Sequence, residues 1–258
     1  MHVVPDTGSD WMLVEGHKCD NCAGDKFNAD ISGVKEPVTK RSERKYGSVI
    51  FWGSEYRDKV CLVDSPDACE DKFRFFLIEK SKARHHYKGI LEPVDGIMGL
   101  SRPELPELLY NRKKLKNKKG YKTGDNLFLT IADREINGEK KQKIFSFYFA
   151  AMGEQSFIDY YGYLLYNVRG QSEKNIKWLD VHTPDYYWSV ECYGVSFGKP
   201  SEMASKSGEK PGNSYRFEEE SLYTLFDTGA SYIGFPKPYW DHFVENLIAA
   251  ASVNKPFT

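Results

Sequence analysis

The chain has 258 residues, 40% of them apolar and 28% charged, with a formal net charge of -1 at pH 7. This length permits one large domain or two of ordinary size, and the composition excludes a disordered chain. The balanced charge argues against a nucleic-acid partner. No apolar run approaches the roughly 20 residues that a membrane-spanning helix needs, so no membrane segment is expected. Tyrosine (17) and phenylalanine (16) are plentiful, which favours a sheet-rich fold.

In residues 1–80, β-rich runs alternate with glycine-containing turns, which predicts short strands. Residues 44–63, RKYGSVIFWGSEYRDKVCLV, contain two β-rich runs with turn residues between them and predict a hairpin. The apolar run DGIMGL at 95–100 is broken by two glycines, which indicates a tight backbone crossing. Residues 105–122 begin like a helix and end in a basic run, which is typical of a solvated insertion rather than a specific binding patch.

The remainder of the chain mixes predicted helices and strands. Residues 125–138, DNLFLTIADREING, predict a helix that stops at Gly138, and residues 236–251 predict a second helix from their apolar spacing. Residues 199–214 are rich in Gly, Ser, Pro and Lys and predict a loop. Strands are predicted at 144–150 (IFSFYFA), 162–168 (GYLLYNV), 176–181 (IKWLDV) and 186–198 (YYWSVECYGVSFG).

The tripeptide Asp-Thr-Gly occurs twice, in VVPDTGSDW (3–11) and in LFDTGASYI (225–233), with an apolar lead-in each time. Asp and Gly favour turns, which explains one copy well. Two chance copies are about a 0.1% event at ordinary residue frequencies, so turn formation explains both copies poorly. If the two loops face each other across a two-fold axis, Asp6 and Asp227 lie within a few Å. Two like charges that close do not both ionise easily, so the pair shares one proton.

Such a pair acts as general base and general acid at once. One carboxylate takes a proton from a water, and the other carboxyl donates a hydrogen bond to a substrate carbonyl. This chemistry needs no metal and no other cofactor. Ser9 can hydrogen-bond Asp6, whereas Ala230, at the matching position, cannot do so for Asp227. The residues expected to support the pair, through close backbone approach and hydroxyl bonds across the loops, are Thr7, Gly8, Ser9, Thr228 and Gly229.

The five cysteines leave several interpretations open. Cys19 with Cys22, and Cys61 with Cys69, could form two short-loop disulfides in an oxidising compartment, with Cys192 as an odd thiol. The same residues could instead be reduced structural cysteines. A zinc site built from the first four is disfavoured by the spacing of the second pair and by the lack of a regularly placed histidine.

The motifs together resemble those of the pepsin-like aspartic proteases, peptidase family A1. DTGSDWMLV (6–14) and LFDTGAS (225–231) are similar to the two D-T-G motifs of the family, and VDGIMGL (94–100) is close to its D-G-I-L-G-L. KYGSVIFWGSEYRDKV (45–60) is similar to the flap, the hairpin that covers the cleft, with Tyr46, Gly47 and Ser48 at its tip. Cys19 and Cys22 fall where the family has a small disulfide loop. The resemblance covers nearly the whole chain, in order.

The resemblance implies a mostly β, bilobal fold of two pseudo-symmetric β-barrel-like lobes. We expect residues 1–150 to form the N-terminal lobe with the first D-T-G and the flap, and 151–258 a partial C-terminal lobe with the second. Five residues precede Asp6 and 31 follow Asp227, fewer than in the family, so we expect a chain truncated at both ends with an incomplete second lobe.

The resemblance also implies the activity of an aspartic endopeptidase. The expected enzyme is a monomer that takes an extended polypeptide substrate, uses no nucleic acid, and works in a lysosome or vacuole or after secretion. The N-terminus itself shows no signal peptide. The alternatives are a truncated, catalytically inactive relative that at most binds peptides, and an unrelated β-rich protein whose D-T-G sequences only form turns.

Two positions depart from the family pattern. Pro5 precedes Asp6 where the family usually has Phe, Val or Leu, and proline cannot donate a hydrogen bond within a sheet. The tryptophan that supports the flap tyrosine in the family falls at Leu13, and Trp11 lies two positions earlier.

Overall fold

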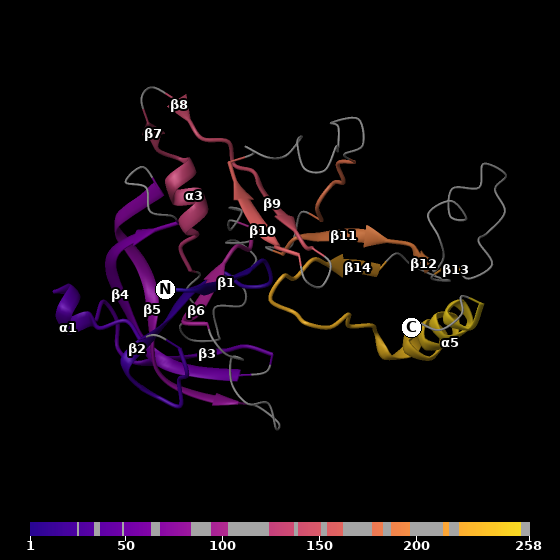
Figure 1. Ribbon diagram of the computed structural model, residues 1–258, viewed down its shortest axis with the longest axis horizontal. Helices are drawn as coiled ribbons and strands as arrows, with labels where there is room; N and C mark the ends of the chain where they lie inside the picture. Colours follow the sequence, from indigo (N-terminus) through magenta and orange to yellow (C-terminus); the bar gives the residue numbers. More distant parts are fainter. Residues whose placement is uncertain are drawn as a thin grey trace, which may run out of the picture.

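The computed structural model describes residues 1–24, 26–33, 37–47, 49–62, 68–83, 94–102, 124–136, 139–150, 154–161, 177–182, 187–196, 214–216 and 222–253. The strands labelled in Figure 1 are β1 (Val3–Asp6), β2 (Met12–Asp20), β3 (Ser42–Lys45), β4 (Val49–Cys61), β5 (Cys69–Ala83), β6 (Gly96–Gly99), β7 (Glu135–Ile136), β8 (Glu139–Lys140), β9 (Phe145–Tyr148), β10 (Phe157–Tyr160), β11 (Ser189–Cys192), β12 (Gly194–Ser196), β13 (Ser214–Arg216) and β14 (Leu222–Leu225). The helices are α1 (Ala29–Ser32), α3 (Leu127–Ala132) and α5 (Lys237–Val253). The mostly β fold class is therefore confirmed.

Among the described strands, six from the first hundred residues form a curled mixed sheet in the order β1-β6-β2-β5-β4-β3 (Figure 1). Strand β6 is parallel to β1 and antiparallel to β2, so it lies between the two strands that flank the first D-T-G loop. This is the tight crossing that DGIMGL predicts. Pro5 lies in β1, at the end of this strand order, which is where a sheet tolerates a residue without an N–H.

The hairpin predicted within residues 44–63 is present as β3 and β4, which pair antiparallel from Ser42↔Gly53 to Lys45↔Ile50. The backbone N–H of Tyr46 donates to the carbonyl of Val49 at 2.9 Å and closes the turn. Strand β4 continues along β5 and forms the longest ladder of the sheet. The turn at Tyr46 and Gly47 therefore extends from β4, a strand that is paired on both sides, with β3 and with β5.

Both faces of the sheet are covered, because side chains alternate along each strand. On β5, Phe73, Phe75 and Leu77 face one core, whereas Phe76 and Ile78 face the other. The α3-side core comprises Met12, Val14, Phe73, Phe75, Leu77, Met98, Leu100, Leu127, Phe128 and Ile131. The flap-side core comprises Trp11, Leu13, Cys19, Val49, Phe51, Phe76, Ile78 and Ile97, and Tyr46 packs against it. The residues around the first D-T-G loop are thus fixed from two sides.

Helix α3 is shorter than the helix predicted over 125–138. Asn126 caps it by accepting a hydrogen bond from the Leu129 N–H at 3.1 Å. It ends at Ala132 and is followed by β7, because Arg134 binds the Cys69 carbonyl and the Glu70 carboxylate on β5 and draws the chain out of the helix. Gly138, the predicted stop, lies outside the described residues.

The second half of the chain forms two-stranded ribbons: β9 with β10, β11 with β14, and β12 with β13. Strands β9, β11 and β12 fall within segments predicted from sequence, and helix α5 covers most of the predicted 236–251 and continues to Val253. The strand predicted at 176–181 is wrong for its described part, because residues 177–181 are irregular and expose Trp178 and Leu179. The predictions at 105–122 and 162–168 lie outside the described residues, as does the loop predicted at 199–214 except for Ser214, which begins β13.

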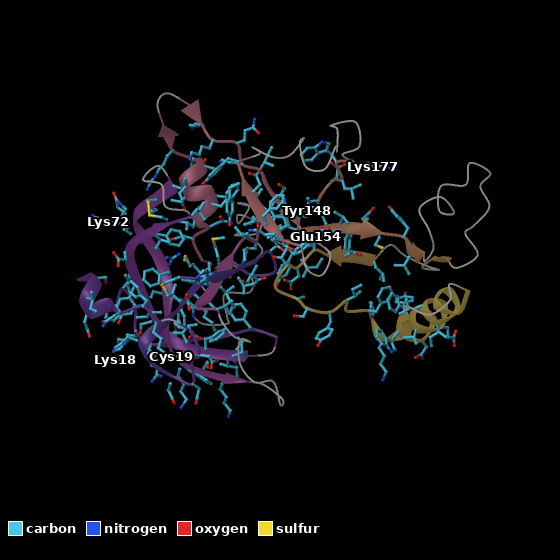
Figure 2. All side chains as sticks on the ribbon, viewed as in Figure 1. Lys18, Cys19, Lys72, Tyr148, Glu154 and Lys177 are labelled. Carbon is cyan, nitrogen blue, oxygen red and sulfur yellow. A yellow bond between two sulfur atoms is a disulfide. The ribbon has the colours of Figure 1, made fainter. Side chains whose placement is uncertain are left out.

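The ribbons contact the sheet through a small set of side chains. The Phe145 ring meets Trp188 edge-on at 5.4 Å, and the Trp188 indole N–H donates to the Leu100 carbonyl at 2.7 Å. Figure 2 shows Tyr148 and Glu154 in this central region, where β9 and β10 approach β11, and Cys19 on the far side of the sheet. These contacts bring β14, and with it the second D-T-G loop, to the edge of the sheet.

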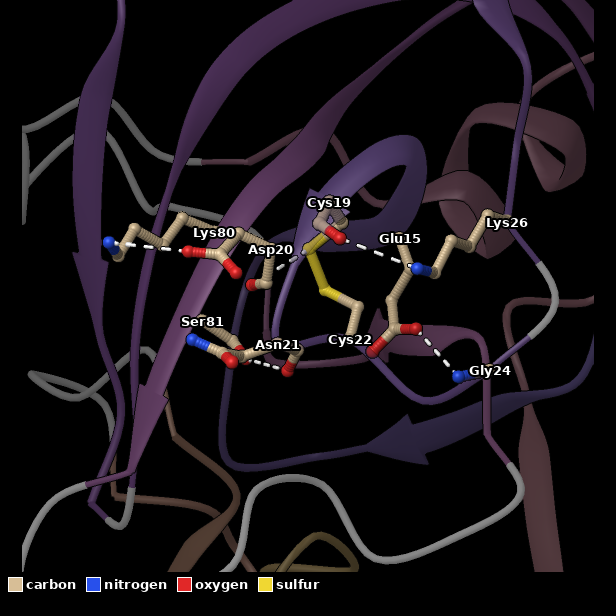
Figure 3. Close-up of a disulfide and its surroundings, with 9 residues drawn as sticks. All are labelled: Glu15, Cys19, Asp20, Asn21, Cys22, Gly24, Lys26, Lys80 and Ser81. Atoms are coloured by element: carbon tan, nitrogen blue, oxygen red, sulfur yellow. Dashed lines mark hydrogen bonds and ion pairs between the residues drawn. A yellow bond between two sulfur atoms is a disulfide. The ribbon is translucent and has the colours of Figure 1, made fainter.

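Two disulfides, Cys19–Cys22 and Cys61–Cys69, confirm the disulfide interpretation of the cysteines. Figure 3 shows the loop closed by the first: the Ser81 hydroxyl donates to the Asn21 carbonyl at 2.5 Å, and the Gly24 N–H donates to the Glu15 carboxylate at 2.8 Å. Because both pairs are oxidised, they do not form the alternative zinc site. Cys192 has no disulfide partner in the described part of the chain.

Burial of large side chains in the flap-side core should contribute strongly to the stability of this sheet. Phe76 is fully buried, so Phe76→Ala should lower the free energy of unfolding by about 3–5 kcal/mol through lost burial and a cavity. Phe149 is 71% exposed, and Phe149→Ala should change it by less than about 0.5 kcal/mol. Urea unfolding of both variants checks this. Equal losses would contradict the placement of the core.

Candidate active site

The two D-T-G loops face each other. Asp6 is the last residue of β1, and Asp227 follows the end of β14 by two residues. The Asp6 and Asp227 carboxyls lie close enough that Asp227 raises the pKa of Asp6. A Cβ on Gly8 would come within 2.4 Å of the Asp227 Cγ, and one on Gly229 within 2.4 Å of an Asp6 carboxylate oxygen. Only glycine permits this approach, so each loop is shaped to fit the other loop's aspartate.

The two threonines interlock the loops with a reciprocal set of hydrogen bonds. The Thr7 N–H donates to the Thr228 hydroxyl and the Thr228 N–H donates to the Thr7 hydroxyl, each at 3.0 Å. The Thr7 hydroxyl in turn donates to the Phe226 carbonyl at 2.7 Å, and the Thr228 hydroxyl to the Pro5 carbonyl at 2.6 Å. Each hydroxyl therefore accepts once and donates once, always across the interface between the loops.

Within each loop, a backbone N–H orients the carboxylate. The Gly8 N–H donates to Asp6 Oδ1 and the Gly229 N–H to Asp227 Oδ1, both at 2.9 Å. The symmetry ends there, because the Ser9 hydroxyl donates to Asp6 Oδ2 at 2.5 Å and the matching residue, Ala230, has no hydroxyl. Asp6 is also buried, whereas Asp227 is partly exposed. The two carboxyls therefore have different surroundings.

This environment changes the acidity of Asp6. The pKa of Asp6 is raised from an ordinary value of 3.8 to about 6, and burial is the largest cause. The neighbouring Asp227 carboxyl and its charge contribute to this rise, while the bonds from Ser9 and Gly8 oppose it. A proton is therefore held at this site well above the pH at which an isolated aspartate loses it.

Several supporting residues could not be identified from the sequence. The Leu100 N–H donates to the Asp6 carbonyl at 2.7 Å, and the Ser101 N–H donates to the Ser9 carbonyl at 3.0 Å. Trp188 holds the Leu100 carbonyl from the other half of the chain. Backbone donors carry no side-chain signal, and Trp188 lies in an ordinary strand-like run, so only the tertiary structure reveals them.

Of the three predicted flap residues, Tyr46 and Gly47 are described and Ser48 is not. Tyr46 is half-buried, and its ring meets Phe51 edge-on at 5.5 Å. Gly47 is exposed at the hairpin turn. Within the described residues there is no cluster of His, Cys, Asp and Glu that could hold a metal ion, and no helix long and apolar enough to cross a membrane.

Comparison with known families agrees with this arrangement. The family model of eukaryotic aspartyl protease matches residues 1–256. The chain therefore belongs to the eukaryotic aspartyl proteases, the pepsin-like family. The match spans both D-T-G motifs and excludes an unrelated β-rich protein. No match to a curated protein reaches significance.

The threonine interlock should be worth more than an ordinary pair of side-chain bonds. Thr228→Val keeps the shape but leaves the Pro5 carbonyl and the Thr7 N–H without partners, which should cost about 2–4 kcal/mol of unfolding free energy. Thr130→Val removes a hydroxyl bond to the Asn126 carbonyl within α3 and should cost less than about 1 kcal/mol. Chemical denaturation compares the two, and equal losses would contradict an interlock.

The raised pKa of Asp6 predicts a specific dependence of stability on pH. Folding favours the protonated form, so this stabilisation is complete below about pH 4 and is lost as pH rises through about 6. The pKa change corresponds to roughly 3 kcal/mol. Denaturation of the wild type and Asp6→Asn between pH 4 and 7 should therefore show a steeper decline for the wild type. Parallel curves would show that Asp6 keeps an ordinary pKa.

Proposed function

We propose that the protein is an aspartic endopeptidase in which Asp6 and Asp227 together activate a water molecule. The observation that carries this proposal is the close approach of the two carboxyls, held by interlocked loops from distant parts of the chain. Turn formation alone does not explain why two acidic side chains lie close together, because the repulsion between them opposes folding at neutral pH.

The proposed reaction is a direct attack of water on the peptide carbonyl. With one proton on the pair, the ionised carboxyl accepts a proton from water as its oxygen bonds to the carbonyl carbon. The protonated carboxyl gives its proton to the carbonyl oxygen. The tetrahedral diol then collapses: the C–N bond breaks as the protonated carboxyl gives its proton to the leaving nitrogen, and one diol hydroxyl returns its proton to the other carboxylate as the C=O bond re-forms. The aspartates then hold one proton again, and no covalent enzyme intermediate forms.

The surroundings of the two carboxyls support this division of labour. The raised pKa of Asp6 keeps one proton on the pair up to about pH 6, so both the acid and the base are present in acidic solution. The backbone bonds from Gly8 and Gly229 fix both carboxyls before substrate binds. Preorganised groups of this kind do not need to reorient during the reaction.

We assign the substrate as a polypeptide bound in extended conformation under the flap, with Tyr46, Gly47 and Ser48 at its tip. A flap that closes over the bound peptide keeps bulk water away from the carboxyls. The proposed lobes are residues 1–150 and 151–258, each contributing one D-T-G loop, and the proposed enzyme is monomeric. The two disulfides suit an oxidising compartment, in keeping with secretion or delivery to a lysosome or vacuole.

A second candidate function is peptide binding without hydrolysis. It is favoured by the partly exposed position of Asp227 and by the exposure of Phe226, Tyr232 and Ile233 around the second loop, in contrast to the buried Asp6. A carboxylate exposed to water interacts more weakly with nearby groups than a buried one, because water screens its charge. Cleavage and binding are therefore separate outcomes of one assay.

Peptide hydrolysis between pH 2 and 7 tests the proposal. The wild type should cleave in acid and lose activity as pH rises through about 6, when the pair loses its shared proton. Asp6→Asn and Asp227→Asn should each lower kcat/KM by about 10³-fold or more. Asp241→Asn, an exposed carboxylate on α5, is the matched control and should be fully active. Full activity of either Asn variant would contradict the mechanism. Peptide binding by the wild type without cleavage would support the second candidate function.

A further inference from the structure

A buried arginine lies at the base of the flap. Arg44 is on β3, two residues before Tyr46, and its side chain is 11% exposed. The guanidinium carbon lies 4.5 Å from the centre of the Trp11 ring and 4.8 Å from that of Phe76. Its Nε is buried without a hydrogen-bond partner among the described residues, so contact with the two rings is a main part of what holds it.

The charge of Arg44 is balanced inside the sheet. One Nη donates to the Glu55 carboxylate at 3.1 Å, and Arg74 approaches the other oxygen of Glu55 at 3.5 Å. Arg74 then forms two bonds to the Asp125 carboxylate, at 2.9 and 3.0 Å. Two positive and two negative side chains alternate, with Glu55 only 3% exposed. This arrangement fixes the geometry around Glu55, because a buried carboxylate needs its positively charged partners in place.

This chain of charges connects the flap to the first D-T-G loop. Trp11 lies five residues after Asp6 and packs under both guanidinium groups, with that of Arg74 at 5.0 Å. Beside Asp125, the Gly124 N–H donates to the Asp10 carboxylate at 3.1 Å. The loop that carries Asp6 and the strand that leads to Tyr46 are thus fastened to one cluster, although they are far apart in sequence.

We propose that Arg44 is a positioning residue for the flap: stacked on Trp11 and paired with Glu55, it sets where the tip at Tyr46 stands over the two aspartates. This rests on the proposed function for its catalytic consequence. Tyr46 packs on the same core as Trp11 and Phe76, the two rings that Arg44 covers. Arg44 itself is not placed against substrate or the reacting atoms.

The alternative is that Arg44 only fills the flap-side core. Replacing a residue that only fills the core would increase unfolding of the whole fold, whereas replacing an anchor of the flap would increase opening of the hairpin alone. Arg41 supplies a matched control on the same stretch of chain, because it forms an ion pair with Glu79 at 3.1 Å but is 55% exposed. Replacing each arginine by methionine removes the charge and keeps an unbranched chain.

Hydrogen exchange monitored by mass spectrometry separates the two. Arg44→Met should raise exchange of the 43–51 amides about tenfold and that of α3 by less than about twofold, since α3 packs on the opposite face of the sheet. Arg41→Met should match the wild type in both segments. If Arg44→Met does not fold, Arg44→Lys is used, and faster exchange of 43–51 is again expected because an ammonium lacks the planar face that stacks on Trp11.

Peptide hydrolysis supplies the second readout. Arg44→Met should lower kcat/KM about tenfold, through a looser flap, while the pH at which activity falls stays unchanged because Asp6 keeps its bonds from Ser9 and Gly8. Unchanged exchange of 43–51, or an equal rise in both segments, would overturn the proposal. If the wild type cleaves nothing, the proposed function fails, while the exchange result still decides the role of Arg44 in holding the hairpin.

Discussion

The reciprocal bonding of Thr7 and Thr228 is the constraint on which the site depends. Two aspartates do not stay in contact by mutual attraction, because their charges repel and burial raises the cost of ionising Asp6. The threonine hydroxyls offset this cost with four bonds that run from each loop into the other. The close approach of the carboxyls is thus imposed by neutral groups beside them, and the proton that we propose they share would follow from that approach.

The rest of the described fold holds the two loops in position. Strand β6 threads between β1 and β2 and binds the first loop through the Leu100 and Ser101 N–H groups. Trp188 ties the Leu100 carbonyl to the segment before β11, and β11 pairs with β14, which leads into Asp227. A continuous path of hydrogen bonds, with one side-chain link at Trp188, therefore runs from one aspartate to the other. In the second loop Phe226, Gly229 and Ala230 are themselves exposed, in keeping with the greater exposure of Asp227.

The sequence predicted the parts of the structure that local chemistry determines. The hairpin at the flap, the crossing at 95–100, both disulfides and the helix at the C-terminal end each have a pattern in the residues themselves. The helix predicted over 125–138 is longer than α3, because Arg134 contacts β5, which is distant in sequence. The predicted strand at 176–181 has apolar residues, but its described part has no neighbour to pair with. Likewise, the Arg44–Trp11 contact joins two positions with no recognisable spacing, and Pro5 is tolerated because of where β1 lies in the sheet.

The most direct test of the central claim is a titration of the carboxyls themselves. Carbon-13 NMR of protein labelled at aspartate carboxyl groups should show one resonance with a pKa of about 6, absent from Asp6→Asn. In Asp227→Asn the same resonance should titrate at lower pH, because the negative charge of Asp227 that helps to raise the pKa is gone, yet above the ordinary value because Asp6 remains buried. Two results would contradict a pair that shares one proton. One is a resonance with a pKa of about 6 that Asp227→Asn leaves unchanged, and the other is the absence of any aspartate that titrates near pH 6.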